Sequence, residues 1–138
     1  MNDKKKNMHE GISTYQKTDV LTANRETILL MLYAGAIRFL RAGIEAAQAG
    51  KLSAKCENIT RVQRIISELR ATLNFESGRE IAGGLDALYS FITRRLIEGI
   101  TTNDTSGLCE ALKLLEDLNH SWEKAVAQIR AGTVDSQG

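Results

Sequence analysis

At 138 residues the chain fits one domain, which can bury roughly two thirds of its unfolded surface without disulfide or metal support. Its formal net charge of only +1 argues against nucleic acid as the main partner, because phosphate binding requires a basic face. The composition is 43% hydrophobic and 25% charged, and it contains no proline, so long helices are permitted throughout.

The first segment, residues 1–22, lacks sustained apolar periodicity and is rich in polar groups. Ile12, Tyr15 and Leu21 are scattered through it, and such side chains need a surface on which to pack. We expect a mobile N-terminal tail with a few apolar anchors. Its basic residues are not followed by the apolar core of a signal peptide, which favours a cytosolic protein.

Helical periodicity then appears in four segments, each with apolar residues at steps of three and four. The expected helices span residues 24–49, 53–74, 79–100 and 105–131. Asn24 is a plausible N-cap of the first, and Gly50 a plausible C-terminal stop. Short connections make sequential helices antiparallel. The sequence therefore predicts an all-α, up-down-up-down four-helix bundle over residues 23–131, followed by a frayed C-terminal tail at 132–138.

The apolar residues form seams of the kind that pack one helix on another. The seams of the first two segments are Leu29, Tyr33, Ala36, Leu40 and Ala47, and Ile59, Val62, Ile66, Leu69 and Leu73. Those of the third and fourth are Ala82, Leu85, Tyr89, Ile92 and Leu96, and Leu108, Ala111, Leu115, Leu118, Trp122, Ala125 and Ile129. Seams of this kind alone would also suit an oligomeric coiled coil.

Nothing in the pattern predicts catalysis. A metal site in a bundle core uses Glu-x-x-His pairs on two helices, and the nearest relative of that signature here is Asp117 with His120. Cys56 and Cys109 fall within helical patterns and are read as ordinary small residues. Gly83 and Gly84 lie inside a helical pattern rather than in a phosphate loop, which favours a surface notch or close packing. We expect no enzyme activity, no metal and no cofactor.

Surplus apolar surface is the most informative feature. Residues 28–37 are apolar around the whole circumference of the expected helix, although this run is too short to span a bilayer, so no membrane insertion is expected. The third helix has a second apolar row that includes Ile81, Leu88 and Phe91, and Ile65 is an extra apolar residue on the second. These four residues form the predicted binding groove, unless the tail or a wide core covers them.

Several strings of the sequence resemble the flagellar export chaperones of the FliS family. The matching strings are Tyr15 with residues 20–23, residues 28–37, residues 78–82, Leu85 with residues 88–89, residues 94–96, and residues 114–115 with Trp122. They occur in the family's order over most of the chain. One departure is Gly84-Leu85, where the family usually has Asn-Leu.

The resemblance implies a cytosolic chaperone that binds the disordered C-terminal segment of flagellin, blocks its premature polymerisation and presents it to the flagellar export gate. It also implies that the N-terminal tail lies over the apolar surface as a gate, with Ile12, Tyr15 and Leu21 as its contacts. The free protein is expected to be a monomer or a weak homodimer. The alternative is a helical scaffold or adaptor that associates with itself through the same apolar rows.

Overall fold

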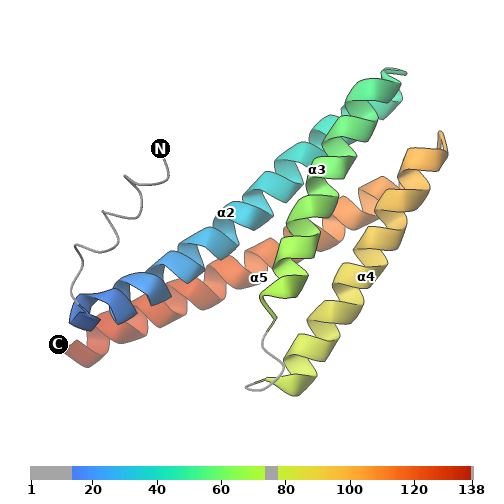
Figure 1. Ribbon diagram of the computed structural model, residues 1–138. Coiled ribbons are helices and arrows are strands. Elements are labelled where there is room, and N and C mark those ends of the chain that lie inside the picture. The colour runs from blue at the N-terminus through green and yellow to red at the C-terminus, as the bar shows by residue number, and fades with distance from the viewer. Residues whose placement is uncertain (1–13, 74–77, 138) are drawn as a thin grey trace.

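The computed structural model describes the backbone of residues 14–73 and 78–137 and the side chains of residues 25–73 and 78–132. These residues form four helices and no strand: α2 (Thr14–Gln48), α3 (Leu52–Ala71), α4 (Arg79–Thr101) and α5 (Ser106–Gln137) (Figure 1). The predicted all-α bundle is confirmed.

Each helix packs against two neighbours, in the closed order α2, α3, α4, α5. Contacts between α2 and α5 show that these two run in opposite directions: Arg41 pairs with Glu116, while Glu26 pairs with Arg130 near the other end. Figure 1 shows consecutive helices reversing direction in the same way. Residues near the start of one helix therefore contact residues near the end of the neighbouring helix.

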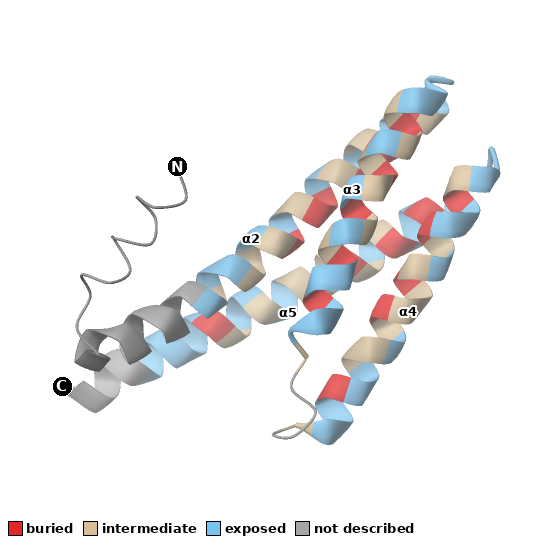
Figure 2. Ribbon diagram, in the orientation of Figure 1, coloured by how far each residue is buried: buried red, intermediate tan, exposed pale blue. Residues whose placement is uncertain are grey.

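The core follows the predicted seams through the middle of the bundle (Figure 2). Its fully buried large side chains are Tyr33, Leu40, Ile59, Val62, Ile66, Leu69, Tyr89, Ile92, Leu96, Leu108 and Leu115. The fourth seam is wrong at its end, because Ile129 is 54% exposed and Val126 is buried instead. Val126 is buried where the seam predicted Ala125, so the buried face of α5 shifts by one residue at this end.

Two predicted helix boundaries are also wrong. Helix α2 begins at Thr14, so Asn24 lies inside the helix and the helical part of the predicted tail includes Tyr15 and Leu21. Helix α5 runs to Gln137 instead of ending at residue 131. The first extension contains neither proline nor glycine, and Gly132 costs only about 1 kcal/mol in a helix. Weak apolar periodicity therefore does not indicate the absence of a helix.

The end of α2 has the turn that the sequence predicted. Gly50 has φ +73°, and the amides of Gly50 and Lys51 donate to the carbonyls of Ala47 and Ala46. This is the paired hydrogen-bond pattern of a Schellman motif, which requires the left-handed conformation that glycine adopts freely. Gly50 therefore stops α2, as predicted, and turns the chain into α3.

The segment Arg25–Gln48 of α2 is long and apolar enough, by length and composition, to cross a membrane. The central helix of a soluble bundle meets the same criterion. In this fold Tyr33, Ala36 and Leu40 of that segment are fully buried against the other helices. The place of α2 in the core thus explains part of its apolar character.

Candidate apolar binding site

The site arises from unequal helix lengths. Helix α3 ends at Ala71 and α4 begins at Arg79, whereas α2 and α5 continue side by side past those ends (Figure 1). The pairs of Arg130 with Glu26 and with Thr27 hold the two long helices together there. The apolar seam of α2 therefore runs on beyond the helices that cover it elsewhere, and a groove opens at this end of the bundle.

We call this depression the end groove; it has a volume of about 720 Å³. Its walls come from all four helices. The described residues that line it are Arg25, Ile28, Leu29, Leu32, Leu69, Thr72, Leu73, Gly78, Ile81, Ala82, Leu85, Tyr89 and Trp122. Arg25 is the one charged residue among them, so the groove suits an apolar ligand.

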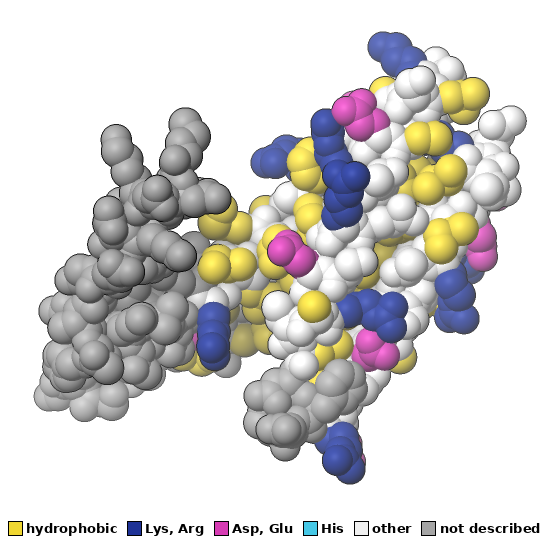
Figure 3. Space-filling view, in the orientation of Figure 1, with side chains coloured by type: hydrophobic (Ala, Val, Ile, Leu, Met, Phe, Trp, Pro, Cys, Tyr) yellow, Lys and Arg dark blue, Asp and Glu magenta, His cyan; other side chains and the backbone are white. Residues whose placement is uncertain are grey.

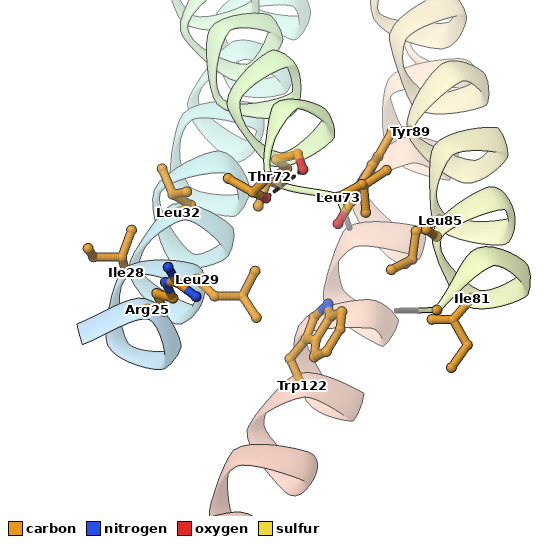
Figure 4. A pocket seen from close by; sticks show the side chains of 13 residues that line it. Arg25, Ile28, Leu29, Leu32, Thr72, Leu73, Ile81, Leu85, Tyr89 and Trp122 are labelled. Carbon is orange, nitrogen blue, oxygen red and sulfur yellow. Dashed lines mark hydrogen bonds between the residues drawn. The ribbon is translucent and has the colours of Figure 1, made fainter. Parts of the chain in front are cut away.

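The groove has apolar walls and an apolar rim. Leu29 of α2 and Leu85 of α4 point toward each other across it, with the indole of Trp122 between them (Figure 4). At the rim, Ile28 is 53% exposed and Ile81 is 70% exposed. Large aliphatic side chains left in water at the mouth of an apolar groove favour binding of a partner.

Polar groups meet at the floor of the groove, where it borders the core. The hydroxyl groups of Tyr33 and Tyr89 are hydrogen-bonded to each other and both residues are buried. Burial raises the pKa of both phenols, so they are neutral at physiological pH. The buried indole Nε1 of Trp122 approaches Tyr33 without reaching good hydrogen-bond geometry. The floor is thus a fixed polar contact beneath an apolar cleft.

The four residues predicted for the groove do not lie together. Ile81 lines the end groove. Ile65 is half-buried against the core, where a Cβ added to Gly35 of α2 would lie 3.5 Å from its Cδ1. It belongs to the contact between α2 and α3.

Leu88 and Phe91 lie farther along α4 and are half-buried. The guanidinium carbon of Arg95 lies 5.2 Å from the centroid of the Phe91 ring, and the same guanidinium pairs with Glu110 of α5. This row therefore borders α5, whereas Ile65 lies at the contact between α2 and α3.

The predicted gate residues fall where the structure gives no side-chain contacts. Ile12 lies outside the described residues. The backbone of Tyr15 and Leu21 belongs to α2, and their side chains also lie outside the described part of the chain. Their role as a gate stays a prediction.

Sequence reasoning missed most of the residues that line the end groove. Leu29, Leu73, Leu85 and Trp122 were assigned to seams, and they are indeed seam residues by spacing. Each lies where the neighbouring helix has ended, so its seam is only half covered. The signal was present in the helix lengths, because a seam that outlasts its partner helix leaves its last residues exposed.

The predicted surplus of apolar surface on α2 is confirmed. Met31 is 66% exposed, and a second groove of about 330 Å³ between α2 and α5 is lined by Thr27, Leu30, Met31, Ala34, Asn119, Glu123 and Arg130. The space-filling view shows hydrophobic side chains at the surface of α2 and around the end of α3 (Figure 3). The apolar run thus serves the core on one side and remains open on others.

Comparison with known proteins identifies the family. The family model of flagellar protein FliS matches residues 8–129. The chain is 32% identical to the flagellar secretion chaperone FliS of Bacillus subtilis over 91% of this chain and 93% of that protein. It is 31% identical to FliS of Vibrio cholerae over 85% and 89%, and 34% identical to FliSB of Pseudomonas aeruginosa over 78% and 85%. The chain belongs to the FliS family of flagellar secretion chaperones.

Proposed function

We propose that the chain binds the disordered C-terminal segment of flagellin in the cytosol, prevents its premature polymerisation and assists its delivery to the flagellar export gate. The family membership supports a flagellar substrate, since the relatives are named flagellar secretion chaperones. The end groove is the observation on which the choice of a disordered apolar client rests.

The shape and lining of the groove favour such a client. A segment that folds only on binding must offset its ordering entropy with many apolar contacts over an extended surface. The end groove offers aliphatic walls from α2, α3 and α4 and almost no charge. No catalytic step is proposed, and Arg25 is the one charged residue among the described lining residues.

Co-expression with a flagellin C-terminal fragment, followed by size-exclusion chromatography, tests this proposal. A one-to-one complex supports the chaperone. The competing function, a self-associating helical scaffold, predicts a dimer whose size is unchanged by the fragment. The free chain is proposed to be a monomer or a weak homodimer.

A matched pair of variants on α4 locates the binding surface. Ile81→Ser removes a 70% exposed aliphatic side chain from the rim of the end groove, and Ile97→Ser removes a 49% exposed one farther along the same helix. Burying an isoleucine contributes about 1.5–3 kcal/mol, so Ile81→Ser is expected to weaken fragment binding roughly tenfold or more. Ile97→Ser is expected to bind as the parent chain does. Equal affinities for the two variants would place the client elsewhere.

We further propose that the N-terminal segment competes with the client for the groove. If the groove were covered 90% of the time, the apparent affinity would fall about tenfold, so deleting residues 1–13 should restore that factor in calorimetry. This deletion removes Ile12 but leaves α2 intact. Tyr15→Ala and Leu21→Ala then test the helical gate residues separately, and weaker binding by either would make it a client contact.

A further inference from the structure

Two consecutive glycines in α4 have no explanation within the described part of the chain. Gly83 and Gly84 are both exposed, and a Cβ added to either would meet nothing within 4 Å. Neither has a left-handed φ, unlike Gly50. Glycine is the weakest helix former after proline, so both positions lower the stability of α4 without an internal benefit. A requirement from outside the chain would account for at least one of them.

The surroundings of Gly84 show what that requirement is. Ile81, Gly84, Leu85 and Leu88 are spaced i, i+3, i+4 and i+7, which is the four-residue outline of a hole that receives one side chain of a packed partner. Ile81 and Leu85 also line the end groove. The hole therefore opens beside the groove, has three aliphatic walls, and has bare backbone at Gly84.

We infer that Gly84 is a specificity-determining residue whose missing side chain admits one large apolar side chain of the bound flagellin segment onto the backbone of α4. This inference rests on the proposed function. The occupant is apolar because the three walls are Ile81, Leu85 and Leu88, and it is large because the hole is deepened by the absence of Cβ. No described residue of the chain fills this position, so it is open to the client.

The hole also connects two surfaces that are otherwise separate. Ile81 on one side belongs to the end groove, whereas Leu88 on the other continues to Phe91 and the border with α5. A segment leaving the groove across Gly84 would reach this row directly. The position of the hole thus gives the client a path over α4.

Gly83 supplies a matched control. It has the same helical context, the same exposure and the same empty surroundings as Gly84. Its neighbours one turn away are Arg79, Glu80, Asp86 and Ala87, of which three are exposed and Asp86 is half-buried and paired with Arg70, so its side of the helix is not the aliphatic hole. Substitution at either position therefore changes the helix propensity of α4 equally, but only substitution at Gly84 places atoms in the hole.

The experiment compares Gly84→Ala and Gly84→Leu with Gly83→Ala and Gly83→Leu, measuring thermal unfolding and calorimetric binding of the flagellin C-terminal fragment. Both alanine variants are expected to raise the melting temperature by roughly 3–6 °C. Gly84→Ala should weaken binding about three- to tenfold and Gly84→Leu by more than tenfold. The Gly83 variants should bind within about twofold of the parent chain.

A double-mutant cycle identifies the occupant. Each large apolar residue of the fragment is truncated to alanine and measured against the parent chain and Gly84→Leu. One truncation should lose most of its effect in the Gly84→Leu background, because the side chain that filled the hole is already excluded.

Three results overturn the inference. If the parent chain binds the fragment and the Gly84 variants bind equally well, the hole is unused although the proposed function stands. If the Gly83 variants weaken binding as much as the Gly84 variants, the effect comes from helix rigidity and not from the hole. If the parent chain does not bind the fragment at all, the proposed function and this inference fall together.

Discussion

The same apolar seams run toward both ends of the bundle, but one end is covered and the other leaves apolar side chains exposed. At the closed end, where α2 meets α3 and α4 meets α5, backbone carbonyl groups at the end of α4 accept hydrogen bonds from a side chain of α3. Lys55 of α3 is buried there, and its Nζ donates to the carbonyl oxygens of Thr102 at 2.8 Å and Ile100 at 3.4 Å. A cation at the C-terminus of α4 also interacts favourably with the helix dipole. The buried ammonium group of Lys55 therefore caps the C-terminal end of α4.

At the open end the same helices leave apolar surface uncovered. Leu29, Leu73 and Leu85 continue their seams into the end groove, and Ile28 and Ile81 stand at its rim. The difference separates two tasks along one bundle. The closed end and the middle bury most of the core, and we propose that the open end keeps its apolar surface for the client.

The largest expected contrast comes from truncating one leucine at each end. Leu108 is fully buried at the closed end, whereas Leu85 is half-buried in the wall of the groove. Leu108→Ala should lower the free energy of unfolding by about 2–5 kcal/mol, because it removes apolar contacts and leaves a cavity. Leu85→Ala should lose less than about half as much while weakening fragment binding. Urea unfolding measures both, and equal losses would mean that the groove is part of the core.

A smaller contrast compares glycines at the two ends. A Cβ at Gly99 would lie 2.6 Å from Cγ of Leu108, so Gly99→Ala requires the buried Leu108 side chain or its helix to shift. Overpacking of this kind should cost about 1–3 kcal/mol of the free energy of unfolding. At the open end, Gly83→Ala is expected to raise it by up to about 1 kcal/mol, since nothing crowds that position. Thermal melts that move in the same direction would contradict the comparison.

The same comparison explains which features of the fold the sequence predicts. The seams and Gly50 depend on local spacing and turn conformation, so the four helices and the core residues Ile59, Ile66 and Leu115 were predictable. The start of α2 and the end of α5 were not, because those stretches lack the apolar periodicity on which the boundaries were judged, although their backbone is helical.

The site was predictable as surplus apolar surface but not as a set of residues. Ile81 was found because it lies outside its seam. Leu85 and Trp122 were missed because spacing makes them core residues, and only the relative lengths of the helices leave them in a groove. Ile65 was included because its face looked polar in sequence, although α2 covers it.

The smallest expected effect lies at the boundary between the two regions, in the Tyr33–Tyr89 hydroxyl pair. Tyr89→Phe removes a buried hydrogen bond and should lower the free energy of unfolding by about 1 kcal/mol at neutral pH. Tyr33→Phe is the matched variant from the other partner. If the pair only supports the floor, fragment binding by both variants should stay within about twofold of the parent chain.

The pH dependence tests the same pair with a definite sign. The pKa of Tyr89 is raised above the ordinary value of 10.0, chiefly by burial, so the folded state holds the phenol's proton more tightly than the unfolded chain does. Its contribution to stability is fully present below pH 10 and is lost as the pH rises further, by about 1.4 kcal/mol per pH unit for this group. Tyr89→Phe lacks that loss, so the stability gap between the variant and the parent chain should narrow above pH 10. Urea unfolding at pH 8 and pH 10.5 measures the gap, and parallel curves would show that Tyr89 ionises equally easily in both states.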